Sequence, residues 1–395
     1  MTTRFRFGLA SFAVLASTIP AYAQYGSSAS VRFDARHIGH MQATGYADPF
    51  TKRLLTVDDP VRVASVSKLA VALGVMRLVE AGKLDLDKDV SAYLGWPLRH
   101  PAFPDTPITL RLLLSHQSGL TDGIDYILPL GATLKGSLAN PAAWEVGHAP
   151  GTWFHYSNLN FPVIASVMEA ATGERFDKLT ARLVFTPLKL DACFNWMTCS
   201  DSKVARAVVL TDGAGTVRKD RLDGKRPPCP VATTADSTCD LAAYVPGSNG
   251  ALFSPQGGMR ISVRDLARIG QLLARRGRGF ITPASFKALT TPAWRFNGSN
   301  GETEGGFFCG YALAVQTLAN PQAGCHDDPV GDGIARIGHP GEAYGLRSGL
   351  WLDPKTGKGV AFFVTAVADD AAKGQSAFTM AEEAPIRDSL GPLHK

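Results

Sequence analysis

Short runs that alternate apolar and polar residues lie near both ends of this chain, within residues 30–63 and again within 307–368. Such runs, bounded by Asp, Pro and Gly, are typical of β-strands, and the closely spaced C-terminal ones indicate an antiparallel meander. Between them, residues 67–81, 108–116 and 160–188 carry apolar residues at the three- and four-residue spacing of helices. We therefore predict an α+β fold, an α/β sandwich, in which both chain ends build one antiparallel sheet flanked by helices, with a mainly helical domain inserted.

The same changes of pattern predict where the domains begin and end. We expect a sheet domain formed by residues 24–64 and 250–395, and a mainly helical domain over residues 65–249 that carries a cysteine-bearing loop insertion. The chain has 395 residues, of which 45% are hydrophobic and 19% charged, so it can bury a large core across two interleaved domains. Two further helices are expected in the sheet domain. One lies within residues 254–277, is introduced by a Gly-Gly turn and has Asp265 near its start, and the other spans residues 375–390.

The first residues have the composition of a secretory signal. Arg4 and Arg6 precede an apolar run, and Ala21-Tyr22-Ala23 supplies the small residues of a cleavage site. The run is interrupted by Ser and Pro and is shorter than the roughly 20 apolar residues of a membrane span, so we favour cleavage before Gln24 over a membrane anchor. We expect residues 1–23 to be a signal peptide and the protein to be periplasmic or secreted.

Charge and hydropathy limit the partners that we expect. Loss of the signal removes two arginines and no acid, which leaves a net charge of +3 and argues against a nucleic-acid partner. No later stretch is apolar enough for a stable membrane span. We expect a monomer that acts on a small-molecule or peptide substrate, with peptidoglycan among the candidates.

Six cysteines, an even number, fit an exported protein. They form three couples that are close in the sequence, and the simplest prediction pairs 193 with 199, 229 with 239 and 309 with 325. A zinc site is the alternative, but the chain has no CxxC pair, and the only histidine beside a cysteine is in Cys325-His326. We therefore expect disulfides that hold loops together.

Ser65 and Lys68 stand three residues apart where the most apolar helical stretch begins. Residues at this spacing share a helix face, and the N-terminus of a helix favours both an activated hydroxyl and a bound oxyanion. A lysine that is partly buried there can lose its proton near neutral pH and act as a base. A serine at a helix start is also a common cap, so the pair alone leaves a structural role open. A second Ser-x-x-Lys, Ser200 to Lys203, lies in the cysteine-bearing region with no apolar helix after it, and we set it aside.

Tyr156 and Asn158 form the second candidate element, just before an apolar helical stretch. The phenol can pass a proton, and the amide can hold a substrate carbonyl or the lysine amine. A core tyrosine followed by an Asn cap is the structural alternative.

His339, in Gly338-His339-Pro340-Gly341, is the third candidate element and lies on a predicted strand. Glycines such as Gly341 let a ligand approach the backbone closely, and the histidine could give a hydrogen bond or a positive charge to a substrate carboxylate. A histidine on a strand is also often structural.

Taken in order, stretches between about residue 60 and residue 365 resemble the serine β-lactamase and penicillin-binding-protein superfamily. They are most similar to its class C-like branch, which also holds DD-peptidases, D-aminopeptidases and carboxylesterases. The stretches are ASVSK followed by GVMRLVEAGKLDLDKDVSAYL, ITLRLLLSHQSGL, PGTWFHYSN, SPQGGMRISVRDLARI and IGHPGEAYGLRSG.

The resemblance implies an acyl-enzyme mechanism. Ser65 would attack an amide, lactam or ester carbonyl, with Lys68 and Tyr156 sharing the base and acid roles. Asn158 would orient Lys68 and the acyl side chain of the substrate. The backbone N–H groups of Ser65 and Glu342 would form the oxyanion hole. The resemblance implies no metal and no organic cofactor.

This chain departs from class C β-lactamases proper, which carry a lysine where His339 stands. Many esterase- and peptidase-like relatives carry a histidine there. A literal Lys-Thr-Gly triplet, Lys355 to Gly357, follows Asp353-Pro354 and separates two strand-like runs, which is typical of a hairpin tip. The segment between the predicted cleavage site and the first strand is also too short for the full N-terminal helix that is usual in the family.

We therefore expect an exported serine hydrolase that works through an acyl-enzyme on amide or ester bonds. D-amino-acid peptides, in a DD-carboxypeptidase-like reaction, and small esters are the expected substrates. A class C-like β-lactamase and a non-catalytic penicillin- or peptidoglycan-binding protein are the alternatives. We also expect the long segments 186–250 and 317–333 to wall the cleft and set acyl specificity.

Overall fold

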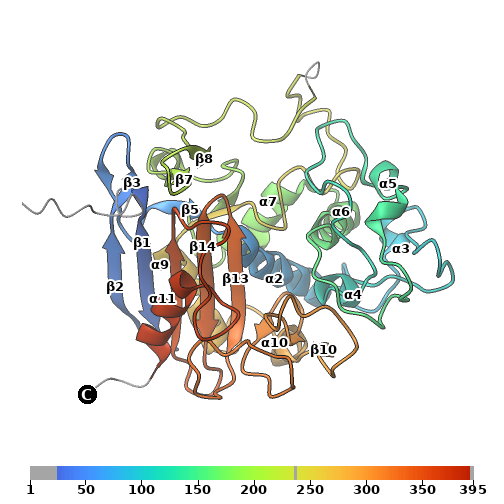
Figure 1. Cartoon of the computed structure of the whole chain (residues 1–395). Coiled ribbons are helices and arrows are strands. Elements are labelled where there is room, and N and C mark those ends of the chain that lie inside the picture. Colours follow the sequence, from blue (N-terminus) through green and yellow to red (C-terminus); the bar gives the residue numbers. More distant parts are fainter. Residues whose placement is uncertain (1–24, 235–237, 392–395) are drawn as a thin grey trace, which may run out of the picture.

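An eight-stranded antiparallel sheet is the centre of the structure, a computed structural model that describes residues 25–234 and 238–391 (Figure 1). The expected signal peptide, residues 1–23, lies outside the described residues. The strand order is β10-β11-β12-β13-β14-β15-β1-β2. Strand β1 (Ser28–Phe33) pairs along its whole length with β15 (Gly359–Val364). Both ends of the chain thus build one sheet, which confirms the predicted α+β fold.

Helices cover both faces of this sheet, and the alternation of side chains along its strands explains how. On β14 (Leu346–Leu352), Trp351 packs in a cluster with residues of α11 (Met380–Leu390), whereas its neighbour Leu350 belongs to the main core that includes α9 (Val263–Ala274). Figure 1 shows α11 in front of the sheet and α9 behind it. Each face of the strand is therefore apolar and covered, as in a sandwich of layers.

Helix α2 (Ser67–Glu80) is the longest helix of the inserted region, and 11 of its 14 residues are buried. It contacts α6 (Asn160–Thr172) closely, since a Cβ on Gly74 would lie only 3.1 Å from the Met168 side chain. The helix matches the predicted residues 67–81, and Gly82, with a φ of +65°, follows its end.

The remaining elements are mostly short. The other helices are α3 (Ser91–Leu94), α4 (Leu110–Leu114), α5 (Leu134–Ser137), α7 (Phe176–Thr180), α8 (Asp201–Val204) and α10 (Pro283–Thr290), with the 3-10 turns η1 (Ala64–Val66) and η2 (Pro141–Ala143) and the π-helical turn η3 (Ala181–Phe185). The other strands are β2 (Ile38–Thr44), β3 (Tyr46–Asp48), β4 (Arg53–Leu54), β5 (Pro60–Arg62), β6 (Cys193–Phe194), β7 (Leu210–Thr211), β8 (Val217–Lys219), β9 (Met259–Ser262), β10 (Trp294–Arg295), β11 (Gly310–Tyr311), β12 (Gln316–Thr317) and β13 (Ile337–Ala343). The predicted domain boundaries at residues 64/65 and 249/250 stay a prediction.

The predicted helix at residues 254–277 is only partly right. Its first part forms strand β9, which pairs with β5 and β6 in a three-stranded sheet. Helix α9 begins after Ser262, whose side chain accepts a hydrogen bond from the N–H of Asp265 and caps the helix. The strand was hidden from sequence analysis because its partners lie far away along the chain.

All six cysteines form disulfides, and the predicted pairs are confirmed. They are Cys193–Cys199, Cys229–Cys239 and Cys309–Cys325. The first two lie in the cysteine-bearing region, and the third joins β11 to the loop after β12. Each closes a short loop, as expected of an exported protein.

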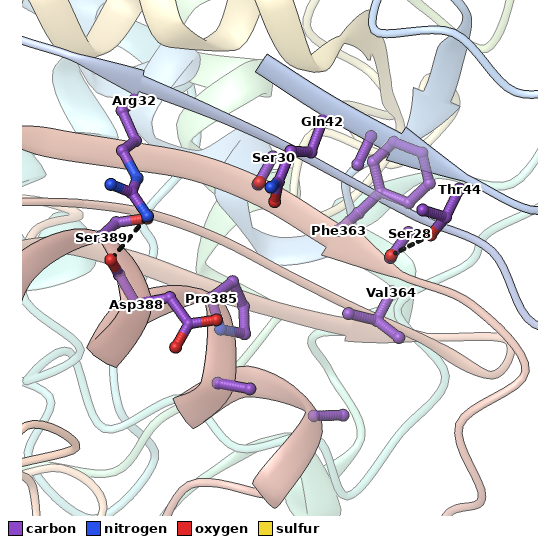
Figure 2. Close-up of a pocket in the computed structure, with 13 residues that line it drawn as sticks. Ser28, Ser30, Arg32, Gln42, Thr44, Phe363, Val364, Pro385, Asp388 and Ser389 are labelled. Carbon is purple, nitrogen blue, oxygen red and sulfur yellow. Dashed lines mark hydrogen bonds between the residues drawn. The ribbon is translucent and has the colours of Figure 1, made fainter. Parts of the chain in front are cut away.

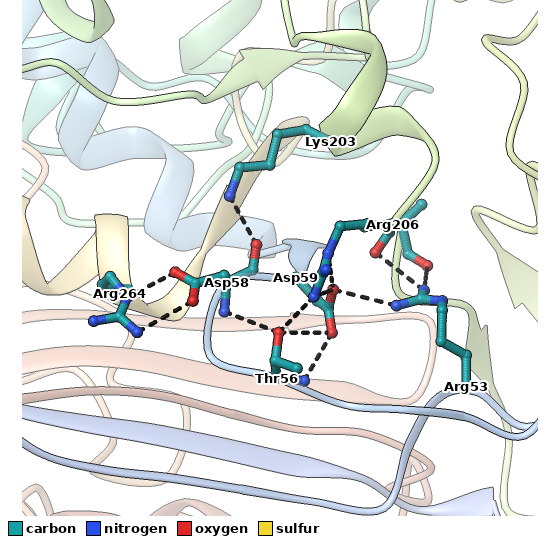
Figure 3. Close-up of polar contacts among 8 residues, drawn as sticks. Arg53, Thr56, Asp58, Asp59, Lys203, Arg206 and Arg264 are labelled. Carbon is teal, nitrogen blue, oxygen red and sulfur yellow. Dashed lines mark hydrogen bonds and ion pairs between the residues drawn. The ribbon is translucent and has the colours of Figure 1, made fainter.

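A polar network anchors the start of strand β5 (Figure 3). The buried carboxylate of Asp59 accepts hydrogen bonds from the Thr56 N–H at 2.7 Å and from Arg206 Nε at 2.8 Å, and Arg53 Nη1 lies 3.2 Å away. Arg206 comes from the cysteine-bearing region, directly after α8. The network thus ties that region to the strand that leads into Ser65.

A groove of about 290 Å³ lies between β1, β2 and α11 (Figure 2). Arg32 spans it and donates to the Asp388 carbonyl at 2.6 Å. None of the predicted site residues lines this groove. Among the residues that the structure describes, no helix is long and apolar enough to cross a membrane.

Asp59→Asn should lower the free energy of unfolding by about 1–3 kcal/mol, because the amide cannot replace a buried carboxylate that accepts from two arginines and Thr56. The matched control is Asp58→Asn, since Asp58 pairs with Arg264 at a half-exposed position where such pairs contribute at most about 1 kcal/mol. Urea unfolding measures both. An equal loss in the two variants would contradict the anchoring role of Asp59.

Candidate active site

Ser65 lies in the turn η1, directly before helix α2. Ala64 has a φ of +45°, a left-handed value that few non-glycine residues adopt, so the backbone turns sharply just before Ser65. Ser67 fixes this turn, because its Oγ donates to the Ala64 carbonyl at 2.6 Å and accepts from the Met259 N–H at 3.0 Å. Strand β9 therefore holds the Ser65 turn in place.

Lys68 is fully buried one helical turn after Ser65. Its Nζ lies 2.9 Å from Ser65 Oγ, 2.8 Å from Asn158 Oδ1 and 2.9 Å from the Gln256 carbonyl oxygen. Burial lowers the pKa of Lys68 to about 7, and the charge of Asp122 acts in the opposite direction. Near neutral pH a large fraction of this amine is therefore uncharged.

The three contacts of Lys68 suit an uncharged amine. The oxygens of Asn158 and Gln256 are carbonyl acceptors, so they take two N–H donors. A neutral amine has only these two donors, and its lone pair is then free to face Ser65 Oγ, whose hydroxyl can donate. When it is uncharged, the Lys68 amine can thus face the Ser65 hydroxyl with its lone pair.

Tyr156 lies beside the Ser65 hydroxyl and lines the same cleft. Lys68 Nζ is 5.0 Å from the centroid of its ring. Burial raises the pKa of the Tyr156 phenol, and the hydrogen bond with the Ser65 side chain acts in the opposite direction. The ring stacks on His116 and on Phe308, with centroids 4.4 and 4.6 Å away. The phenol is therefore held firmly and stays protonated at neutral pH, ready to donate.

Asp122 organises this part of the site, and sequence analysis missed it. Its Oδ1 accepts from the Ser157 hydroxyl and the Leu159 N–H, both at 2.9 Å. Its Oδ2 accepts from the Asn158 N–H at 3.0 Å and from Asn158 Nδ2 at 2.9 Å, which turns Asn158 Oδ1 toward Lys68. In the sequence, Asp122-Gly123 has only the signature of a turn, and the partners lie at least 35 residues away.

Strand β13 passes close to the Ser65 turn because Gly341 has no side chain. A Cβ at Gly341 would lie 2.5 Å from the Val63 carbonyl oxygen and 3.3 Å from the Ser65 nitrogen. The ladder between β12 and β13 includes only Ile337 and Gly338, so the rest of β13 is unpaired on that side. Glu342, the next residue, is exposed and pairs with the buried Arg347 at 2.7 Å.

His339 is fully buried and does not line the cleft. Its Nε2 lies 2.6 Å from Tyr311 Oη, and its Nδ1 lies 2.6 Å from the Pro340 carbonyl oxygen. Burial, together with the charge of Lys68, lowers the pKa of His339 to about 3, so the imidazole is neutral. A positive charge for a substrate carboxylate is therefore not available from this residue.

The cleft above Ser65 has a volume of about 290 Å³. Five of the seven predicted site residues line it, while Lys68 and His339 lie beneath its surface. Segments 186–250 and 317–333 contribute none of its lining, contrary to expectation, and the wall comes instead from residues 304–308. The lining residues are Ser65, Asp122, Tyr156, Asn158, Glu304, Phe307, Phe308, Pro340, Gly341, Glu342 and Glu382.

Contacts of residues 154 and 155 link the segment before Tyr156 to the segment that leads into Glu304. His155 Nδ1 lies 3.2 Å from a carboxylate oxygen of Glu145 and 3.2 Å from one of Glu302. The Glu302 N–H also donates to the Phe154 carbonyl at 2.9 Å. The segment before Tyr156 and the segment that carries Glu304 are therefore fastened to each other.

The family model described as Beta-lactamase matches residues 10–382 of this chain. Esterase EstB of Burkholderia gladioli is 34% identical over 186 residues, which cover 42% of this chain and 46% of the esterase. A D-aminopeptidase of Cereibacter sphaeroides strain KD131 is 26% identical over 352 residues, which cover 80% of this chain and 61% of that protein. The matches thus span less than two thirds of the length of these relatives.

Solved structures with the same fold cover nearly the whole chain. The D-amino acid amidase from Ochrobactrum anthropi SV3 aligns with a TM-score of 0.67 at 20% identity, over 94% of this chain and 93% of the amidase. EstCE1, a hydrolase with promiscuous acyltransferase activity, aligns with a TM-score of 0.66 at 24% identity, over 93% of each chain. These likenesses confirm the predicted fold class.

Hydrolysis of p-nitrophenyl butyrate should become faster as the pH rises through about 7, because Lys68 acts as a base only after it loses its proton. In Asp122→Asn this midpoint should move to lower pH, since the carboxylate that raises the pKa of Lys68 is gone. The maximal kcat/KM should fall about 10- to 100-fold, because an amide cannot accept all four hydrogen bonds.

The matched control for Asp122 is Asp125→Asn on the same loop, where the carboxylate accepts only from the Ile127 N–H. It should keep the wild-type pH profile. A midpoint for Asp122→Asn that equals the wild-type value would show that Asp122 does not act on Lys68.

Lys355→Ala should leave ester hydrolysis unchanged, because Lys355 is exposed in the turn between β14 and β15. His339→Ala should lower it about 10- to 100-fold, because β13 loses the contact with Tyr311 and shifts relative to Ser65. His339→Gln, which can still hydrogen-bond to Tyr311, should restore most of the rate. Steady-state kinetics of the three variants test this prediction. An equal loss of rate in His339→Ala and His339→Gln would contradict the positioning role of His339.

Proposed function

We propose a mechanism from the premise that this chain belongs to the beta-lactamase family and is one of its serine hydrolases. Ser65 Oγ attacks the carbonyl carbon of an amide or ester, and the Ser65 proton passes to Lys68 Nζ. The bond to the leaving group breaks, and the departing amine or alcohol takes a proton from Tyr156. Water then attacks the carbonyl carbon of the acyl-enzyme, and Tyr156 takes a proton from this water. The bond to Ser65 Oγ breaks, Ser65 takes its proton back from Lys68, and the acid product leaves.

The position of the Lys68 amine is the observation that carries this proposal. It is fully buried, it lies 2.9 Å from Ser65 Oγ, and two carbonyl oxygens occupy its other donors. A cap or structural serine at a helix start would not need a buried amine with a pKa of about 7 beside it. We therefore assign Ser65 as the nucleophile and Lys68 as its base.

The backbone N–H groups of Ser65 and Glu342 are the proposed oxyanion hole. The nitrogen of Ser65 lies in the turn η1 directly before α2, and N–H groups at a helix start point away from the helix and can meet a ligand. Gly341 brings β13 against this point, and β13 is open on the side away from β14. A substrate backbone can therefore add to the edge of β13 while its carbonyl enters the hole.

Tyr156, Asn158 and His339 have different proposed roles. Tyr156 is the proton donor to the leaving group, since its phenol faces Ser65 and stays protonated. Asn158 holds the Lys68 amine and contacts the acyl side chain of the substrate. His339 is a positioning residue beneath β13, because it contacts Tyr311 and not the cleft.

The charge of the cleft supports a substrate with a free amino group. Four acidic residues line it, Asp122, Glu304, Glu342 and Glu382, of which Glu342 is paired with Arg347. Among the described residues, that lining includes no Lys or Arg. Carboxylates attract an ammonium group and repel the free carboxylate that a DD-carboxypeptidase substrate or a β-lactam carries. We therefore propose amides, peptides or esters of D-amino acids with a free amine, in line with the similarity to a D-aminopeptidase.

Small neutral esters are the second candidate substrate. The similarity to Esterase EstB supports them, as do the rings of Phe307 and Phe308 in the cleft wall. The three disulfides support an exported protein, because they persist in oxidising compartments.

The test uses residues 24–395 and compares D-alanine 4-nitroanilide with its N-acetyl derivative. A diacetylated D-Ala-D-Ala peptide, a chromogenic cephalosporin and p-nitrophenyl butyrate complete the substrate set. We expect kcat/KM for the free-amine anilide to exceed that for the N-acetyl anilide about tenfold or more. Ser65→Ala should abolish turnover by about 1000-fold or more, whereas Ser200→Ala, in the second Ser-x-x-Lys, should not change it.

Three other outcomes would contradict this proposal or favour a different function. Equal turnover by Ser65→Ala and wild type would remove Ser65 as the nucleophile. Fastest turnover of the cephalosporin would identify a β-lactamase. A stable mass adduct with penicillin and no turnover of any substrate would identify a non-catalytic binding protein.

A further inference from the structure

A second cavity, of about 340 Å³, shares two wall segments with the catalytic cleft. Arg62 lies at its base, at the end of β5 and three residues before Ser65. Tyr344 follows β13, two residues after Glu342, and Ile127 belongs to the loop that carries Asp122. The cysteine-bearing region supplies most of the other residues. We call this cavity the Arg62 pocket.

Arg62 is only 6% exposed. Its Nε is buried and has no hydrogen-bond partner. Within residues 25–234 and 238–391, no carboxylate forms an ion pair with it. Its guanidinium instead lies 5.1 Å from the centroid of the Tyr344 ring.

Among the described residues that line the Arg62 pocket, Asp220 is the one acidic residue, and it already binds other groups. Asp220 accepts two hydrogen bonds from Arg260, at 2.8 and 3.1 Å, and one from Trp196 Nε1 at 3.0 Å. Lys219, from β8, adds a further positive charge, with its Nζ 5.5 Å from the Tyr344 ring centroid. Positive charge therefore exceeds negative charge around this cavity.

Burying a cation without an ion-pair partner costs free energy, and this lowers the pKa of the group. Burial and the charge of Arg260 lower the pKa of Arg62 to about 10, although Tyr344 and Asp220 act in the opposite direction, and Arg62 stays protonated at neutral pH. An anion in the cavity would pair with this charge and occupy the free Nε. A guanidinium fits a planar carboxylate in particular, because two parallel N–H groups can meet its two oxygens.

We propose that the Arg62 pocket binds a carboxylate through Arg62, with Lys219 as a second cation and Tyr344 as an aromatic wall. The apolar side chains of Ile127 and Leu252 would pack against the carbon skeleton that bears this carboxylate. The carboxylate belongs either to the substrate, in which case the proposal rests on the proposed hydrolase function, or to a separate small carboxylic acid. The pocket gives a role to the cysteine-bearing region, which does not reach the catalytic cleft.

The first arm of the test measures binding without catalysis. Titration calorimetry with succinate should show saturable binding to the wild-type protein, and succinamide, its neutral analogue, should not bind. Arg62→Met should weaken succinate binding about 10- to 100-fold, as expected for loss of a buried charge-assisted pair. Circular dichroism checks that this variant is folded.

A second variant keeps the test decisive if Arg62→Met does not fold. Lys219→Met should weaken succinate binding by a smaller factor, because Lys219 is less buried than Arg62. Arg218→Met is its matched control, since Arg218 precedes Lys219 on β8, points to the opposite face and does not line the pocket. It should bind succinate like the wild type.

The second arm measures kcat/KM for the 4-nitroanilides of D-glutamate and D-glutamine. A preference for D-glutamate that disappears in Arg62→Met supports the pocket as a site for a substrate carboxylate. No preference, together with succinate binding that depends on Arg62, supports it as a site for a separate carboxylate. Absence of both effects overturns the proposal. If no substrate is hydrolysed at all, the proposed function fails, and succinate binding still tests whether the Arg62 pocket binds a carboxylate.

Discussion

The burial of the Lys68 amine is the constraint on which the rest of the site depends. Helix α2 is buried along almost its whole length, so the lysine in its first turn is fully buried. Two carbonyl oxygens, from Asn158 and Gln256, fix the amine and take its donors. Asp122 in turn fixes Asn158. A change in any of these contacts therefore reaches the nucleophile through the amine.

The fold brings these groups together from distant parts of the chain. The turn at Ser65 follows β5, whose start is tied to the cysteine-bearing region by Asp59 and Arg206. Strand β13 comes from the C-terminal part, and Gly341 lets it contact that turn. The sheet formed by both chain ends and the buried helix thus meet at Ser65, and neither part alone contains the candidate site.

The parts of the site that sequence analysis predicted are those with a local signature. Ser65 and Lys68 are one helical turn apart, and Tyr156 and Asn158 stand together before an apolar helix. Asp122 and Glu304 could not be found, because each lies in a loop without periodicity and gains its role from residues far along the chain. The order of strands and helices followed from hydrophobic alternation, which is also local.

The incorrect predictions, those of strand β9 and of the cleft wall, also depend on contacts between residues far apart in the chain. Strand β9 was predicted as the start of a helix because the apolar period of α9 continues into it, and only its pairing with β5 and β6 makes it a strand. The long segments 186–250 and 317–333 were expected to wall the cleft because of their length, but length does not say which cavity a loop lines. The cysteine pairs were predicted correctly, since each loop that they close is short.

The neutrality of His339 follows from the same burial that tunes Lys68. A second cation beneath β13 would repel the ammonium form of Lys68, and the low pKa of His339 reflects this repulsion together with its own burial. The pKa of Lys68 is then set by its burial and by the charge of Asp122. An uncharged imidazole bonded to Tyr311 supports β13 without adding to the charge around the nucleophile. The site thus combines an amine that titrates near neutral pH with a histidine that does not titrate there.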